Sequence, residues 1–314
     1  MLAGSYRPLP YTQFVIHEPK RRVISAAAFR DRVVHHALCA VIEPRFERLF
    51  LPMSFANRVG MGTHAAVKAV RAAAGRYRYV LRVDVRQHFP SIDHQILQSA
   101  LMVHIQEPDV LRLIERILVG GTEILEGSVN QTPFEGDDLL SALRPRGLPI
   151  GNLTSQFWSN CYLHDIDLFV KRELRCEAYA RYVDDLALFS NDKPVLWAWK
   201  ARLQERMARL RLHIHEHSAQ ATPCAAGIPW LGFVVYPTHM RIKGRKVRHS
   251  QRHLIDRYGH WLDGHISFAE FDASVQGWIN HVAQADSWGL REHVLQRFLV
   301  PPAFSPRHAG RRKP

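Results

Sequence analysis

The spacing of apolar residues divides the chain into helical and extended segments. Residues 27–43 carry apolar side chains every three or four positions, which predicts a helix that ends at Pro44. The apolar stripe comprises Val33, Val34, Ala37, Leu38, Val41 and Ile42. Further helices are predicted from a cap at Ser91, from Pro108 to Gly121, and over 194–211 and 250–298. Richness in Ala predicts another over 63–75, and a cap at Asn152 or Thr154 predicts a long helix over 152–175. In the segment 250–298 the expected core residues are Trp261, Trp278 and Trp288.

Short runs rich in β-branched and aromatic residues predict the strands. One strand covers residues 78–85 (RYVLRVDV), and a strand–turn–strand unit surrounds residues 182–185 (YVDD). Residues 1–25 predict a hairpin with a basic turn, and residues 230–248 predict another, whose second strand is MRIKGRKVR. Residues 121–146 lack a clear period and predict a loop or an insertion. Strands that carry acids thus alternate with helices before a basic helical C-terminus, which favours an α+β core with appended helical parts.

The chain is strongly basic. Its 314 residues include 42 Lys and Arg against 29 Asp and Glu, which gives a formal net charge of +13. Such an excess predicts an anionic polymer as the partner. Nucleic acid is favoured over a membrane, because no basic amphipathic helix stands out and no apolar run reaches 18 residues. The alternative is a basic protein whose charge serves only its solubility.

Cysteine usage and the N-terminus bear on the compartment. The cysteines Cys39, Cys161, Cys176 and Cys224 form no C-x-x-C pair, which argues against a zinc site and against a disulfide framework. Scattered free cysteines fit a reducing cytoplasm. The first residues lack the apolar stretch of a secretory signal. We therefore expect a cytoplasmic protein without a membrane segment.

Two adjacent carboxylates, Asp184 and Asp185, interrupt the apolar strands around YVDD. A solvated turn would explain them, since Asp is common in turns. Asp84 adds a third acid near the end of the predicted strand 78–85, where a charge is costly unless it is paired or bound to metal. If the two strands lie side by side, three carboxylates meet at one edge and repel each other. Two Mg²⁺ ions would remove that repulsion, and they would activate a 3′-oxygen and stabilise a leaving pyrophosphate in phosphoryl transfer.

At these residues the sequence resembles a known family. YVDD together with LRVDVRQHFPSID is similar to the palm of reverse transcriptases. PIGNLTSQFWSN resembles the fourth block of the reverse transcriptases of diversity-generating retroelements. There, Ile150 stands where group II intron and retroviral enzymes usually have Gln, and Gln156 stands where they have Pro. The likeness extends over nearly the whole chain, through EPKRRVISAAAFRDRVVHHAL, SFANRVGMGTHAAV and GIPWLGF.

The resemblance implies an α+β right-hand polymerase with fingers, a palm built on an antiparallel sheet, and a helical thumb. Residues 1–75 would form the fingers, 76–235 the palm with the insertion 121–146, 236–300 the thumb and 301–314 a basic tail. The implied activity is error-prone, RNA-directed DNA synthesis. The implied partners are a template RNA, a DNA or RNA primer, dNTPs and a small basic accessory protein, the accessory variability determinant. The implied cofactor is a pair of Mg²⁺ ions, with Mn²⁺ as the alternative ion.

The resemblance also assigns roles in catalysis to single residues. Asp84 and Asp184 would be the principal catalytic metal ligands, Asp185 the secondary one, and the carbonyl of Val85 a backbone ligand. Phe89 matches the position of the ribose gate, where an aromatic ring excludes a 2′-hydroxyl. A core Phe is the alternative interpretation.

Other residues would contact the incoming nucleotide. Lys20 and Arg22 lie in the basic turn, whose charges suit a triphosphate but are also typical of a solvated turn. Gly151 lets the backbone approach the nucleotide closely. Ile150 lacks the amide of Gln, which predicts looser selection of the base. His217 is a candidate general acid for the pyrophosphate, or one more surface His among 19.

A further group of residues would contact the primer and the template. They comprise the first two residues of YVDD, an aromatic hairpin that resembles a primer grip, and basic residues of the strip 241–253. In chain order these are Tyr182, Val183, Trp230, Leu231, Gly232, Lys243, Arg245 and Lys246. A positive strip suits the phosphates of an RNA–DNA duplex, although a solvated run of charges would look the same.

Two other functions stay open. Another bacterial reverse transcriptase, of the retron, defence or group II intron type, would share most of these motifs but not the fourth block. A non-catalytic RNA-binding protein on a polymerase scaffold would not need all three Asp residues.

Overall fold

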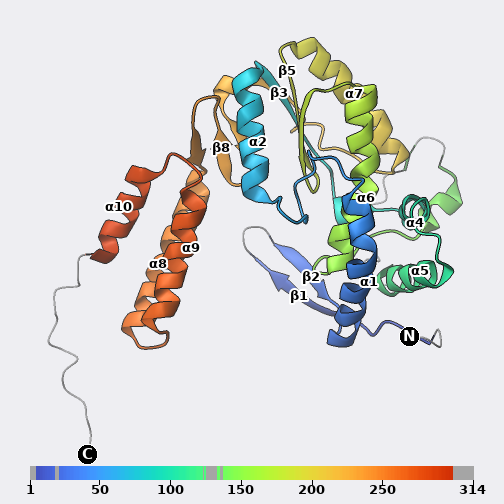
Figure 1. Cartoon of the computed structure of the whole chain (residues 1–314), viewed down its shortest axis with the longest axis horizontal. Helices are drawn as coiled ribbons and strands as arrows, with labels where there is room; N and C mark the ends of the chain where they lie inside the picture. The colour runs from blue at the N-terminus through green and yellow to red at the C-terminus, as the bar shows by residue number, and fades with distance from the viewer. Residues whose placement is uncertain (1–4, 18–20, 123, 125–132, 135–136, 300–314) are drawn as a thin grey trace, which may run out of the picture. The chain divides into compact units, whose positions relative to one another are not determined.

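The computed structural model describes residues 5–17, 21–122, 124, 133–134 and 137–299 (Figure 1). Its chain divides into two compact units, Met1–Cys224 and Ala225–Pro314. The predicted division into fingers, palm and thumb stays a prediction. The palm–thumb boundary that we expected after residue 235 falls inside the second unit.

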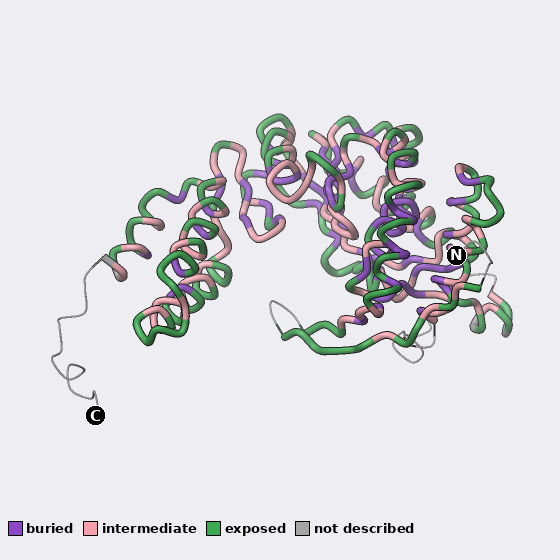
Figure 2. The backbone as a smooth tube through the Cα atoms, turned by 60° about the horizontal axis from the view of Figure 1, so that its bottom comes forward, coloured by how far each residue is buried: buried purple, intermediate pink, exposed green. Residues whose placement is uncertain are grey.

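The first unit begins with an antiparallel hairpin of β1 (Thr12–Ile16) and β2 (Arg22–Ala26). All of β1 and the first half of β2 are exposed, and Figure 2 shows this pair as a largely green ribbon. The end of β2 is different, because Ser25 is buried and its N–H donates to the carbonyl of Ile150 at 2.8 Å. The hairpin is therefore fixed at its C-terminal end.

The centre of the first unit is a four-stranded antiparallel sheet. Its strands are β3 (Tyr79–Asp84), β4 (Ala178–Tyr182), β5 (Asp185–Ser190) and β6 (Ala221–Pro223), in the order β4-β5-β3-β6. Four consecutive residues of β5 are buried, so both faces of the strand are covered. This explains why the sequence shows continuous apolar runs here and not an alternating pattern.

Helices surround this sheet. They are α1 (Phe29–Glu47), α2 (Thr63–Arg76), α3 (His88–Ser91), α4 (His94–Met102), α5 (Pro108–Thr122), α6 (Leu153–Leu168) and α7 (Lys193–Arg209). A π-helical turn, Phe169–Glu173, continues α6, and two 3₁₀ turns cover Leu139–Leu143 and Cys224–Ala226. Part of the segment that we expected to be a loop is thus the 3₁₀ turn at 139–143, which Asp138 caps.

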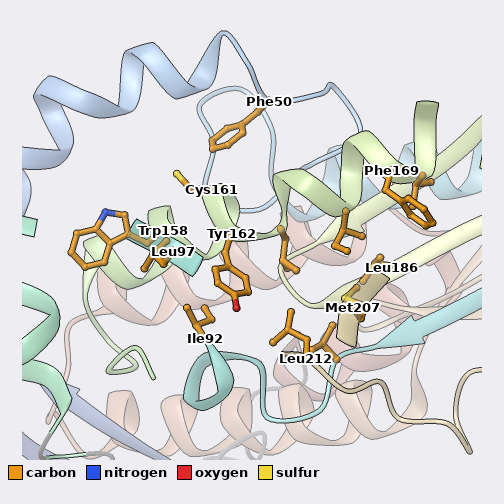
Figure 3. Close-up of a cluster of buried hydrophobic side chains, with 14 of the residues drawn as sticks. Phe50, Ile92, Leu97, Trp158, Cys161, Tyr162, Phe169, Leu186, Met207 and Leu212 are labelled. Carbon is orange, nitrogen blue, oxygen red and sulfur yellow. The ribbon is translucent and has the colours of Figure 1, made fainter. Parts of the chain in front are cut away.

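Helix α6 lies at the middle of the core. Figure 3 shows its side chains Trp158, Cys161 and Tyr162 among residues from the sheet and from neighbouring helices, such as Leu186 and Met207. All five are at most 5% exposed. Burial on this scale stabilises by about 1.5–3 kcal/mol for each large side chain. The core packing therefore fixes the position of α6 and, with it, the positions of the polar residues that the helix carries.

Two predicted helix boundaries in the first unit are wrong. Pro44 does not end α1, which continues to Glu47 because Phe46 is buried and its ring packs 5.5 Å from that of Phe157. Ser91 does not cap the next helix. Asp93 does, since its carboxylate accepts the N–H groups of Gln95 and Ile96.

The second unit combines a small sheet with three helices. Strands β7 (Ile228–Trp230), β8 (Phe233–Val235) and β9 (Met240–Ile242) form an antiparallel sheet. The helices are α8 (Gly244–Leu262), α9 (Phe268–Val282) and α10 (Trp288–Leu299). The predicted strand 240–248 is wrong beyond Ile242, because α8 begins two residues later.

The core of the second unit contains Leu254, Trp278, Val282 and Val294. Trp278 is buried as predicted, and Trp261 is half-buried against aromatic neighbours. Trp288 is not a core residue: it is the first residue of α10 and is 75% exposed. Together the two units confirm the predicted α+β class with antiparallel sheets.

Candidate active site

The three predicted catalytic aspartates meet at one end of the four-stranded sheet. Asp84 is the last residue of β3 and Asp185 is the first of β5, and the two are direct cross-strand partners. Asp184 lies in the turn between β4 and β5, where its carbonyl accepts the N–H of Val85 at 3.2 Å. Residues directly opposite on paired strands have Cβ atoms about 5 Å apart. The fold thus brings together acids that are a hundred residues apart in sequence.

Electrostatics identify this turn as a site of crowded negative charge. Burial raises the pKa of Asp184 to about 6, and the nearby charges of Asp185 and Asp84 add to the rise. A backbone hydrogen bond and the positive charge of Arg22 act in the opposite direction. Carboxylates that repel each other in a half-buried place are stabilised by a cation. The donor chemistry therefore fits a hard divalent ion.

The side chains do not form a finished three-carboxylate cage. No group of three or more His, Cys, Asp and Glu residues among those the structure describes is arranged to hold a metal ion. Asp185 lies 3.5 Å from the guanidinium of Arg82. Mg²⁺ usually binds one or two carboxylates together with water and substrate phosphates. Asp84 and Asp184 match that smaller ligand set, with the Val85 carbonyl as a further candidate.

The predicted nucleotide-binding residues lie around the end of β2. The Ile150 carbonyl accepts the Ser25 N–H, and Gly151 has φ +115°. A Cβ atom at Gly151 would come within 2.7 Å of Ile24 Cγ2, so the glycine lies close against the protein's own β2. The close approach to a nucleotide stays a prediction. Arg22 is the first residue of that strand, and its charge reaches Asp184. The structure thus places Arg22 within electrostatic reach of Asp184, and Ile150 and Gly151 beside the C-terminal part of the same strand.

Phe89 and Lys20 are the other two predicted nucleotide-binding residues. Phe89 belongs to α3, is half-buried and packs against the main core, which agrees with the core interpretation and leaves the gate role a prediction. Lys20 lies outside the described residues.

The residues that precede Asp184 and Asp185 have an unusual backbone conformation or unusual side-chain contacts. Tyr182 accepts a hydrogen bond from the Thr63 hydroxyl at 3.1 Å, so its ring is tied to the start of α2. Val183 has φ +56°, in the left-handed region that a β-branched residue rarely adopts. Arg181, just before them, is completely buried in β4.

The remaining predicted residues are divided between the two units. In the second unit Trp230 is buried, while Leu231 and Gly232 form the left-handed turn between β7 and β8. The basic residues Lys243, Arg245 and Lys246 lie at the start of α8, the last two of them exposed. In the first unit His217 is exposed and lies two residues after His215, whose N–H donates to the Asp84 carbonyl at 2.8 Å.

Sequence reasoning missed two residues that organise the site. Asn152 is buried, and its amide accepts the Ala27 N–H and donates to the carbonyls of Ser25 and Pro149. Arg181 carries a buried charge in the middle of an apolar strand. A charged residue at such a position is itself a signal, because Arg is almost never fully buried unless it is paired. Asn152 gives no comparable signal.

The comparison with known families decides the identity of this fold. A model of the family "Reverse transcriptase (RNA-dependent DNA polymerase)" matches residues 17–235, more than half of the chain. The chain belongs to the reverse transcriptase family. The matched range includes β2, the four-stranded sheet and all three aspartates.

Several curated proteins are similar to this reverse transcriptase. The group II intron-encoded protein LtrA of Lactococcus lactis subsp. cremoris is 26% identical over 170 residues, which cover 53% of this chain and 26% of that protein. Protein YkfC of Escherichia coli (strain K12) is 25% identical over 54% of this chain and 43% of its own length. Nuclear intron maturase 1, mitochondrial, of Arabidopsis thaliana is 31% identical over 31% of this chain and 14% of that protein. The chain thus spans less than half the length of each relative.

Solved structures agree with the fold. The structure of apo telomerase from Candida tropicalis, truncated from its C-terminal domain, matches 74% of this chain and 55% of that chain. The TM-score is 0.50 and the identity 10%, so the likeness concerns the reverse transcriptase fold alone. Within the described ranges, no helix has the length and the apolar composition to cross a bilayer.

Proposed function

We propose that this chain is an RNA-directed DNA polymerase that copies a template RNA from the 3′ end of a DNA or RNA primer. The observation that carries the proposal is the arrangement of Asp84, Asp184 and Asp185 at one end of β3 and β5 in a reverse transcriptase fold. Two Mg²⁺ ions, when bound, would supply the activation of the 3′-oxygen and the charge neutralisation of the departing pyrophosphate.

The chain's own residues would perform the remaining tasks. Asp84 and Asp184 would hold the ions, whose remaining ligands would be water and the substrate phosphates. Arg22, whose charge reaches Asp184, would bind the triphosphate. The exposed basic residues at the start of α8 would contact duplex phosphates.

Primer extension on an RNA template tests this function. The full chain should incorporate dNTPs in the presence of Mg²⁺, and Asp184→Ala should abolish the incorporation. Asp192→Ala is the matched control, because Asp192 is exposed at the start of α7 and its side chain makes no capping bond. The proposal fails if the parent chain incorporates nothing, or if Asp184→Ala incorporates as much as Asp192→Ala.

We further propose that the enzyme is of the diversity-generating, error-prone type, with an accessory protein as partner. The support is the fourth block, where Ile150 stands in place of Gln next to the end of β2. Ile lacks the amide that would constrain the base pair, so we expect misincorporation opposite template adenine. Sequencing of the cDNA should show that Ile150→Gln lowers this error relative to errors at the other bases. Equal adenine errors in the parent and the variant would contradict the idea.

The relatives favour a second candidate of the same chemistry. Their names include a group II intron-encoded protein and intron maturases, which support a reverse transcriptase of the group II intron type. That candidate predicts cDNA without an adenine bias, so the same sequencing experiment separates the two.

A further inference from the structure

Arg181, the residue just before YVDD, makes an unusually complete set of contacts. Its Nε and Nη2 donate to the two carboxylate oxygens of Asp167, at 2.7 and 2.6 Å. Nη2 also donates to the Ser54 hydroxyl at 2.9 Å, and Nη1 donates to the Asn160 side-chain oxygen at 3.1 Å and to the Val183 carbonyl at 3.2 Å. A guanidinium has five N–H donors, and each of them has an acceptor here.

The ion pair with Asp167 needs an explanation beyond stability. Both side chains are 0% exposed. Taking two charges out of water costs about as much as their attraction returns, and apolar pairs of similar volume are often equally stable or more so. A pair of this kind therefore points to a role in fixing one conformation.

The turn after Arg181 is the conformation that needs fixing. Val183 adopts φ +56°, which a β-branched residue avoids, and such strain persists only where the surroundings enforce it. The carbonyls of Val183 and Asp184 are both held, one by Arg181 and the other by the Val85 N–H. These two bonds lie on either side of the Asp184 side chain along the chain.

We infer that Arg181 is a positioning residue of the active site, whose guanidinium, neutralised by Asp167, holds the Val183 carbonyl and keeps the strained turn in the conformation that presents Asp184. The expected effect of Arg181 on kcat rests on the proposed polymerase function. The expected effect on the conformation of the turn rests on the geometry alone. Arg181 acts through the turn and does not contact substrate.

Primer extension with Arg181→Lys tests the catalytic consequence. Lys keeps the charge beside Asp167 but offers only three donors without a planar fork, so the Val183 carbonyl loses its partner. We expect kcat to fall tenfold or more, while KM for dNTP changes by less than about threefold. Arg206→Lys is the matched control: Arg206 pairs in the same two-pronged way with Asp165 on α6, and the substitution should leave kcat within twofold.

A double-mutant cycle with Val183→Gly separates positioning from general stability. Glycine adopts the left-handed region without strain, so the turn would depend less on Arg181. Whatever Val183→Gly does by itself, the kcat penalty of Arg181→Lys should be roughly tenfold smaller when it is combined with Val183→Gly. The same penalty with and without Val183→Gly would overturn the inference.

Two measurements cover the cases in which Arg181→Lys is unstable or the parent is inactive. The triple variant Arg181→Met, Asp167→Leu, Tyr179→Phe removes both charges and also the buried Tyr179 hydroxyl that donates to Asp167. It should fold, yet it should lose kcat as Arg181→Lys does. Full activity of that folded variant would overturn the inference. Hydrogen exchange needs no activity: amides 183–185 should exchange at least tenfold faster in Arg181→Lys than in the parent. Unchanged exchange there would overturn the inference, whereas an inactive parent with the expected exchange would count against the polymerase function only.

Discussion

Substituting Gly151 by Ala tests whether β2 is seated against the loop that begins α6. The new Cβ would meet Ile24 Cγ2 at 2.7 Å, and the φ of +115° is unfavourable for any L side chain. The clash and the backbone strain act at the same position. Overpacking typically costs about 1–3 kcal/mol, and a left-handed residue costs about 1–2 kcal/mol. We therefore expect Gly151→Ala to lower the free energy of unfolding by roughly 3 kcal/mol.

Two other glycines of the first unit separate these contributions. Gly60 has φ +75°, and a Cβ atom added there would have no neighbour within 4 Å, so Gly60→Ala should show the backbone strain alone, about 1–2 kcal/mol. Gly121 has an ordinary helical backbone, but its Cβ would meet Pro149 Cγ at 2.8 Å. Gly121→Ala should show the clash, reduced by up to about 1 kcal/mol because Ala favours a helix.

Urea unfolding of the three variants, followed by circular dichroism, measures these differences, and hydrogen exchange of residues 22–26 locates them. In Gly151→Ala we expect faster exchange in β2 and a raised KM for dNTP, because Arg22 shifts with the strand. If Gly151→Ala costs no more than Gly60→Ala, Ile24 moves aside freely and the seating of β2 is refuted.

Two further predictions concern buried polar groups. Asn152→Asp should lower the free energy of unfolding by about 2–4 kcal/mol at pH 7, because a carboxylate would face the carbonyls of Ser25 and Pro149. The loss, measured by urea unfolding, should shrink at pH 5 as the new acid takes up a proton. The control Asn191→Asp, at an exposed residue, should change stability by less than about 0.5 kcal/mol at both pH values, and an equal cost at the two sites would contradict a role of the Asn152 amide in holding β2. Burial lowers the pKa of His88 from 6.5 to about 3, so its contribution to stability is complete above pH 6.5 and is lost as the pH falls below that value. The variant His88→Gln retains a group that can bond the Ser159 hydroxyl but does not titrate. Its free energy of unfolding should therefore fall less steeply between pH 6 and 4 than that of the parent, by about 1.4 kcal/mol per pH unit. Parallel pH profiles of the parent and the variant would argue against a neutral buried His88.

Much of the fold could be predicted because its elements repeat a local pattern. The helix at 63–75 and the strands on both sides of YVDD match α2, β4 and β5 closely, because the helix is rich in Ala and each strand is a short apolar run. The failures occurred where tertiary contacts override a local signal. Pro44 lies inside α1 because the last turn of that helix buries Phe46, and the start of α8 was taken for a strand because its basic residues carry no apolar period.

The candidate site was predictable where a residue's type and position in the sequence indicate its chemistry. Asp84 and the Asp184–Asp185 pair stand out as charges at the ends of apolar strands, and the sheet register places them together. Their supports were not predictable, because an amide such as Asn152 looks like an ordinary helix cap. It occupies that position, but its side chain bonds Ser25, Ala27 and Pro149 and not the helix.

These supports share one element, helix α6. Asn152 precedes its first turn and holds the end of β2, which carries Arg22. Asn160 and Asp167 are seven residues apart, hence on one face of the helix, and both bond Arg181 beside the catalytic turn. Because the apolar side of α6 is fixed in the core, the helix fixes the residues around the predicted nucleotide site and those around the predicted metal ligands relative to one another. A shift of this helix would therefore disturb both sides together.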